Sequence, residues 1–127
     1  MKTIFTENAP VPVGPYAQAI ITESKNLIFC SGQLGIVRGQ SALISSNVEK
    51  QAVQIFRNIE EVVKAAGCSA KNIVKVNIFL TDLNDFVAVN KIFSLFFENH
   101  KPARSTVEVS RLPMDAKIEI ECIAEGQ

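Results

Sequence analysis

The sequence has little of what metal centres, disulfide frameworks and histidine-based catalysis require. Its 127 residues include no tryptophan, one tyrosine, one histidine and three cysteines, and no two cysteines have Cys-x-x-Cys spacing. An odd number of scattered cysteines argues against a disulfide framework or a zinc site and fits a reducing, cytoplasmic environment. We therefore expect Cys30, Cys68 and Cys122 to be structural, and any activity to need no metal.

The formal net charge of the chain is zero, because 13 basic side chains balance 13 acidic ones. Such a chain lacks the basic footprint of a nucleic-acid-binding protein, and near-neutrality permits self-association. No apolar run approaches the length of a membrane span, and residues 1–7 contain no apolar signal segment. We expect a cytoplasmic protein with neither a membrane nor a nucleic-acid partner. The length favours one domain over residues 1–127.

Hydrophobic periodicity predicts two helices separated by strands. Alternation or short apolar runs predict strands over 3–6, 16–22, 26–31, 73–80, 103–110 and 117–124. A capping box over 46–49 begins a helix with an apolar stripe that ends at Gly67. A second helix follows Asp82 and ends near His100. Three prolines over 8–15 predict an extended segment.

The predicted order, β-β-β-α-β-α-β-β, indicates an α/β fold. Each strand-helix-strand unit can lay its helix on the same side of one sheet, so both helices cover a single face. The opposite face carries Leu27, Phe29, Ile73 and Phe79. It is too apolar for solvent, which favours packing against other subunits.

The last two strands read as a hairpin that carries charged side chains on one face. Its apolar face holds Val107, Val109, Ile118 and Ile120. Period-two alternation then places Arg104 and Glu119 together on the other face. A fixed guanidinium can grip a carboxylate ligand, and a nearby carboxylate can handle a proton or a water molecule. The alternative is an ordinary solvated face.

The register of this hairpin leaves the Arg104–Glu119 relation open. If Ser110 pairs with Lys117, Glu119 lies opposite Glu108. Glu108 is four strand residues beyond Arg104, which is roughly 13 Å. A bulge, another register or a neighbouring subunit would then be needed to bring Arg104 and Glu119 together.

Several short motifs follow one another along nearly the whole chain. They are Gly14-Pro15-Tyr16-Ala17-Gln18-Ala19, Ser31-Gly32-Gln33, Asp82-Leu83-Asn84-Asp85-Phe86 with Val89-Asn90, Pro102-Ala103-Arg104-Ser105, Val107-Glu108-Val109, and Leu112-Pro113 through Lys117-Ile118-Glu119-Ile120-Glu121. In this order they resemble the RidA family, also called the YjgF or reactive intermediate deaminase family. The resemblance implies a chorismate-mutase-like fold and a homotrimer with ligand clefts between subunits. It also implies cofactor-free hydrolysis of enamines and imines, such as 2-aminoacrylate, to 2-keto acids and ammonia.

The resemblance also implies roles for individual residues. Arg104 matches the arginine that binds the substrate carboxylate, and Glu119 matches the glutamate associated with the reacting water. The matching substrate-binding positions around the cleft are Tyr16, Ser31, Gly32, Asn90 and Thr106. Thr106 departs from the family pattern, because many deaminating members have cysteine there; part of that role belongs to main-chain atoms.

Two other functions remain open at this level. The scaffold could bind a small carboxylate without catalysis and regulate partners, or it could cleave RNA. Neutral charge and the lack of a histidine pair argue against RNA cleavage. Ammonia release in an assay coupled to a dehydratase that generates enamine distinguishes the deaminase from the non-catalytic protein.

Overall fold

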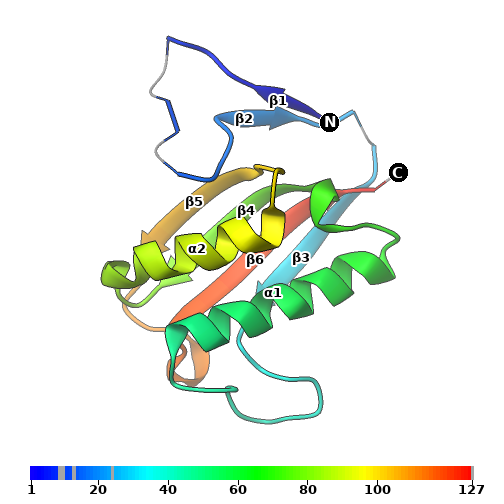
Figure 1. Cartoon of the computed structure of the whole chain (residues 1–127). Coiled ribbons are helices and arrows are strands. Elements are labelled where there is room, and N and C mark those ends of the chain that lie inside the picture. Colours follow the sequence, from blue (N-terminus) through cyan, green and yellow to red (C-terminus); the bar gives the residue numbers. More distant parts are fainter. Residues whose placement is uncertain (9–10, 13, 24, 127) are drawn as a thin grey trace.

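Two helices cover one face of a four-stranded sheet in the computed structural model of the chain (Figure 1). The structure describes residues 1–8, 11–12, 14–23 and 25–126. The helices are α1 (Val48–Ala65) and α2 (Phe86–Phe97). The strands of the sheet, in spatial order, are β3 (Leu27–Gln33), β6 (Ile118–Glu125), β4 (Ile73–Leu80) and β5 (Ala103–Glu108). The predicted α/β class, element order and placement of both helices on one face are confirmed.

The first two strands form a small sheet of their own rather than extending the main one. β1 (Lys2–Ile4) pairs with β2 (Ala19–Ile21) in an antiparallel ribbon, which lies outside the sheet edge formed by β5 (Figure 1). A single bridge between Ala17 and Ala103 links this region to β5. Of the extended segment expected over residues 8–15, residues 9, 10 and 13 lie outside the described part of the chain.

The core forms where α1 and α2 press on the two central strands. Fully buried positions alternate along β4 and β6, as expected for strands with one face against helices. The largest fully buried side chains of the helices and strands together include Ile55, Ile59, Ile78, Phe93, Ile118 and Ile120. Asn47 caps α1 by accepting a hydrogen bond from the Lys50 amide at 2.9 Å. The cap therefore lies one residue later than the capping box predicted.

The predicted hairpin between the last two strands is wrong. β4 lies between β5 and β6, parallel to β5 and antiparallel to β6. The segment from β4 through α2 to β5 is thus a parallel crossover, which needs the helix to return the chain to the same end of the sheet. The alternating pattern of residues 103–110 and 117–124 identified two strands but not their partners, because both can pair with the buried β4.

The sheet face away from the helices is apolar, as the sequence predicted, and it carries Leu27, Phe29 and the half-buried Phe79. Phe29 is 72% exposed, and Leu27 and Val107 are 43% and 46% exposed. Ile73, expected on this face, is instead fully buried in the core, because β4 shifts register against β6 between Ile73 and Lys75.

All three cysteines are free and buried, in keeping with structural roles. Cys30 and Cys122 are directly opposite each other on β3 and β6. Burial, together with the neighbouring Cys30 thiol, raises the pKa of the Cys122 thiol. Cys122 is therefore protonated and unreactive near neutral pH. No helix in the described part of the chain is long and apolar enough to cross a membrane.

Gly35 sets the distance between α1 and the loop that follows β3. A Cβ atom added to Gly35 would lie 2.8 Å from the Cα atom of Gln51, inside α1. We expect Gly35→Ala to lower the free energy of unfolding by about 1–3 kcal/mol, because backbone atoms must move apart. Urea denaturation measures this. Gln40→Ala is the control: Gln40 is exposed in the same loop, so alanine should change stability by less than about 0.5 kcal/mol.

Candidate functional site

Arg104 lies half-buried near the start of the edge strand β5, beneath α2. Its Nη1 donates a hydrogen bond of 2.6 Å to Oδ1 of Asn90. Its Cζ atom lies 4.9 Å from the ring centroid of Phe93, 5.4 Å from that of Phe86 and 5.2 Å from that of Tyr16. Phe86, Asn90 and Phe93 are spaced i, i+4 and i+7, so they share one face of α2. We call these four neighbours and Arg104 the arginine cluster.

The charge of Arg104 is not compensated within the described residues. None of their carboxylates lies within 4.0 Å of the guanidinium. Burial lowers the pKa of Arg104, against a smaller opposing effect of Tyr16, yet a guanidinium remains protonated at neutral pH. Taking a cation partly out of water without an anion is unfavourable. The site therefore favours an anionic ligand.

Gly14 leaves space beside the guanidinium of Arg104 because it has no side chain. A Cβ atom at this position would lie 3.3 Å from Nη2 of Arg104 and 3.3 Å from Cε1 of Tyr16. Both distances are tighter than ordinary van der Waals contact. Any side chain here would crowd Nη2, so glycine keeps that nitrogen open.

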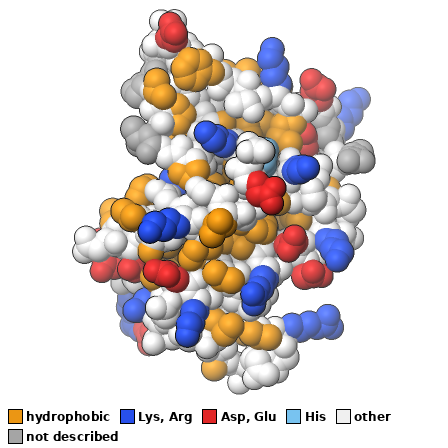
Figure 2. Space-filling model, in the orientation of Figure 1, with side chains coloured by type: hydrophobic (Ala, Val, Ile, Leu, Met, Phe, Trp, Pro, Cys, Tyr) orange, Lys and Arg blue, Asp and Glu red, His pale blue; other side chains and the backbone are white. Residues whose placement is uncertain are grey.

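A hollow of about 790 Å³ runs along the flank of α2 beside this cluster. Its lining residues are Phe86, Val87, Asn90, Lys91, Ser94 and Leu95. Phe86 and Asn90 also contact Arg104, so the hollow adjoins the arginine cluster. Its volume lies in the range of small-molecule sites. On the helix face, further hydrophobic side chains gather between α2 and α1 with charged side chains around them (Figure 2).

Glu119 lies on β6, and its carboxylate lies over Gly32 of the neighbouring strand β3. A Cβ atom on Gly32 would lie within 2.9 Å of the Glu119 carboxyl carbon and would overlap Oε1. The register between β3 and β6 shifts between Cys30 and Gln33, which brings Gly32 beneath this carboxylate. Ser31, the exposed residue before it, belongs to the same irregular stretch. The predicted residues Ser31, Gly32 and Glu119 thus lie together.

Arg104 and Glu119 point to opposite faces of the sheet, which corrects the prediction that they share one. Arg104 is directly opposite Val76, a core residue, so it faces the helices. Glu119 lies between Ile118 and Ile120, which are both fully buried under the helices, so Glu119 faces away from them. The prediction failed because the hairpin that it assumed does not form. One chain therefore holds two separate groups of predicted site residues.

Thr106 lies two residues beyond Arg104 and shares its face. It pairs with Ile78 of β4. Its Oγ1 atom is buried and has no hydrogen-bond partner among the described residues. A buried hydroxyl is ordinarily hydrogen-bonded, so this oxygen has an unused capacity for a hydrogen bond.

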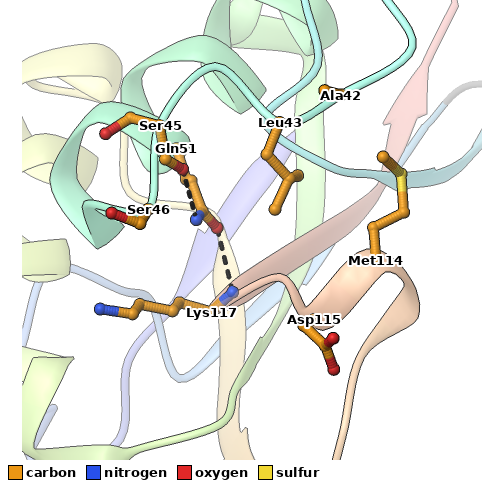
Figure 3. Close-up of a pocket in the computed structure, with 8 residues that line it drawn as sticks. All are labelled: Ala42, Leu43, Ser45, Ser46, Gln51, Met114, Asp115 and Lys117. Carbon is orange, nitrogen blue, oxygen red and sulfur yellow. Dashed lines mark hydrogen bonds between the residues drawn. The ribbon is translucent and has the colours of Figure 1, made fainter.

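A second cavity, of about 450 Å³, lies between the 42–46 loop and the 113–117 turn (Figure 3). Gln51 of α1 closes it: Nε2 donates to the Ser45 carbonyl at 2.8 Å, and Oε1 accepts from the Lys117 amide at 3.0 Å. This buried amide therefore connects the 42–46 loop to the residue that precedes β6, the strand that carries Glu119. None of the predicted site residues lines this cavity.

The other polar residues near the two groups have structural partners. Glu108 accepts a hydrogen bond from the Leu83 amide at 3.0 Å, and Glu121 accepts one from Asn77 at 3.1 Å. His100 Nε2 lies 2.6 Å from the Ile73 carbonyl oxygen. The described residues contain no group of three or more side chains that could hold a metal ion.

Residues 6–126 match the model of the family described as Endoribonuclease L-PSP. The chain belongs to this family. It is 47% identical over 126 residues to the 2-iminobutanoate/2-iminopropanoate deaminase of Escherichia coli K12, covering 97% of this chain and 96% of that one. It is 46% identical over 123 residues to the chloroplastic Reactive Intermediate Deaminase A of Arabidopsis thaliana, covering 97% of this chain and 65% of that one. The resemblance to the RidA family is thereby confirmed.

The fold agrees with solved structures of relatives. The crystal structure of E. coli TdcF with bound serine superposes with a TM-score of 0.75 at 39% identity, and the match covers all of both chains. The ligand in that relative is an amino acid, which carries a carboxylate.

Sequence reasoning missed three members of the site, namely Gly14, Phe86 and Phe93. Gly14 and Phe86 fall inside the motifs of the resemblance, but neither carries a polar group that marks it as functional. The spacing of Phe86 and Phe93 with Asn90 was a usable signal, because residues at i, i+4 and i+7 share a helix face. It could not be connected to Arg104 until the partners of β5 were known.

Proposed function

We propose that this chain hydrolyses reactive 2-imino acids and their enamine tautomers, such as 2-aminoacrylate, to 2-keto acids and ammonia. The observation that carries the proposal is Arg104, a half-buried guanidinium with no carboxylate partner among the described residues. It suits the carboxylate that every such substrate carries beside its reacting carbon. The names of the deaminase relatives support the same chemistry.

Arg104 is the proposed anchor of the substrate carboxylate. Charge-assisted hydrogen bonds contribute roughly 1.5–3 kcal/mol each, so a two-pronged contact can dominate the binding of so small a molecule. Fixing the carboxylate also fixes the direction from which water attacks the adjacent carbon. Thr106 Oγ1, on the same face as Arg104, is a further proposed ligand contact, with Tyr16 and Asn90 around it.

Glu119 is the proposed base for water, and we place it in the cleft from a neighbouring subunit. Arg104 lies on the edge strand β5 and faces the helices, whereas Glu119 faces away from the helices and lies beside β3. One chain therefore cannot bring the two side chains together. A head-to-tail contact between copies pairs two different surfaces and closes into a ring. The exposed apolar face with Leu27, Phe29 and Val107 supplies surface for such contacts. We propose a homotrimer on this basis.

The proposed reaction balances with water alone. The enamine tautomerises to the imine, and water adds to the C=N carbon while Glu119 accepts a proton from it. Glu119 passes this proton to the nitrogen, which gives the neutral carbinolamine. As the C–N bond breaks, the hydroxyl proton of the carbinolamine moves to the nitrogen, so ammonia leaves and the carbonyl of the 2-keto acid forms. No electron is transferred to another group, so the reaction requires no redox cofactor.

Arg104→Lys tests the anchor, because lysine keeps the charge but lacks the planar fork. We expect kcat/KM to fall by about 10- to 100-fold, which corresponds to one charge-assisted hydrogen bond. Ammonia release is measured with a dehydratase that generates the enamine in situ. Arg111→Lys, at a side chain that is 82% exposed, is the matched control. Near-normal kcat/KM in Arg104→Lys would mean that Arg104 does not hold the carboxylate.

Glu119→Gln separates catalysis from binding. Glutamine preserves size and much of the hydrogen bonding but cannot accept the proton, so kcat should fall by about 10²–10⁴. Calorimetry should still detect 2-keto acid binding, because Arg104 is unchanged. Glu61→Gln, at a side chain that is 73% exposed, is the control. A kcat within about threefold of the parent contradicts the base role. A parent chain that binds 2-keto acids but releases no ammonia would instead be the non-catalytic carboxylate-binding protein.

A further inference from the structure

The described side chains that hydrogen-bond to Arg104 or place a ring beside its guanidinium are all electrically neutral. Its hydrogen-bond partner is the side-chain amide oxygen of Asn90, and its other neighbours are three aromatic rings. A partly buried arginine is ordinarily paired with a carboxylate, which would remove the cost of burying the charge. The neutral surroundings of Arg104 thus hold the cation in place and leave its charge uncompensated.

The remaining nitrogens of the guanidinium make no hydrogen bond to a described residue. Only Nη1 makes a hydrogen bond to a described residue. Nη2 lies beside Gly14, in the space that a Cβ atom would crowd. The rings lie within the distance of cation–π attraction, so they stabilise the cation without occupying its N–H groups. Asn90 therefore fixes Nη1 of the guanidinium, while Nη2 keeps its N–H groups for another acceptor.

Asn90 is an unexpected residue for its position in α2. The helix reads Phe-Val-Ala-Val-Asn-Lys-Ile-Phe-Ser-Leu-Phe-Phe, and Asn90 is its fifth residue, well inside the helix. Asparagine is a poor helix former because its side chain competes with the backbone for hydrogen bonds. The contact with Arg104 explains its presence, and an aspartate of the same shape could make the same contact.

We propose that Asn90 is a positioning residue, which fixes Arg104 through Nη1 without neutralising it and so leaves the guanidinium charge to the ligand carboxylate. The proposal rests on Arg104 as the anchor of the proposed function. It assigns Asn90 a role through Arg104, in place of the direct substrate contact that the resemblance implies. An aspartate at this position would act as an internal competitor of the ligand.

Asn90→Asp tests this directly, because it keeps the shape and the acceptor while adding one negative charge. The probe is pyruvate, whose binding to the assembled protein is measured by calorimetry beside the melting temperature. We expect the Kd for pyruvate to rise at least about tenfold, equivalent to about 1.4 kcal/mol, while the melting temperature stays equal or rises. Asn84→Asp is the matched control: the same change at an exposed residue before α2 should alter Kd by less than about twofold.

Asn90→Ala supplies the second comparison, because it removes the acceptor without adding charge. Its Kd should lie between those of the parent and Asn90→Asp, since Arg104 loses its fixed orientation but keeps its full charge. If Asn90→Asp binds pyruvate as tightly as the parent, the contact is merely structural and the proposal fails. If the parent binds pyruvate but releases no ammonia, the deaminase proposal fails while this one stands. A parent that does not bind pyruvate overturns the anchor and this proposal together.

Discussion

The central constraint in this structure is the partial burial of one positive charge without a negative partner. Arg104 is kept at the edge of the sheet by an amide oxygen and three aromatic rings, which come from α2 and the segment before β2. This arrangement is less stable than a paired arginine, and a bound carboxylate would remove the deficit. The glycine at residue 14 and the asparagine within α2 are both consistent with it.

The sheet topology determines what Arg104 can reach. Because β4 lies between β5 and β6, the two predicted reacting groups occupy opposite faces and different regions of the sheet. Gly32 allows the Glu119 carboxylate to lie over β3, on the face that also carries exposed Phe29 and Leu27. The deaminase site that we propose therefore requires a second copy, and the exposed apolar face provides surface for copies to associate.

The features that were predicted correctly from the sequence are those that depend on local periodicity. The stripe of α1, the alternation of β4 and β6 and the burial of both helices on one face follow from spacing alone. Strand partners do not, because the pattern of residues 103–110 suits a hairpin as well as a parallel crossover. This one ambiguity produced the error about Arg104 and Glu119. It also hid the contact between Arg104 and α2, which joins residues 11 to 18 positions apart on different elements. The motifs identified the residue types of the site, whereas the neutral surroundings of Arg104 required coordinates.

The most direct test of a site divided between copies is complementation between two inactive variants. Arg104→Lys and Glu119→Gln chains are mixed in equal amounts, unfolded, refolded together and assayed for ammonia release. In a ring of three, each mixed trimer regains one intact site, so about one quarter of parental activity should return. If both groups acted within one chain, every site would keep one substitution, and activity would remain at the level of the separate variants. That second result would contradict the account.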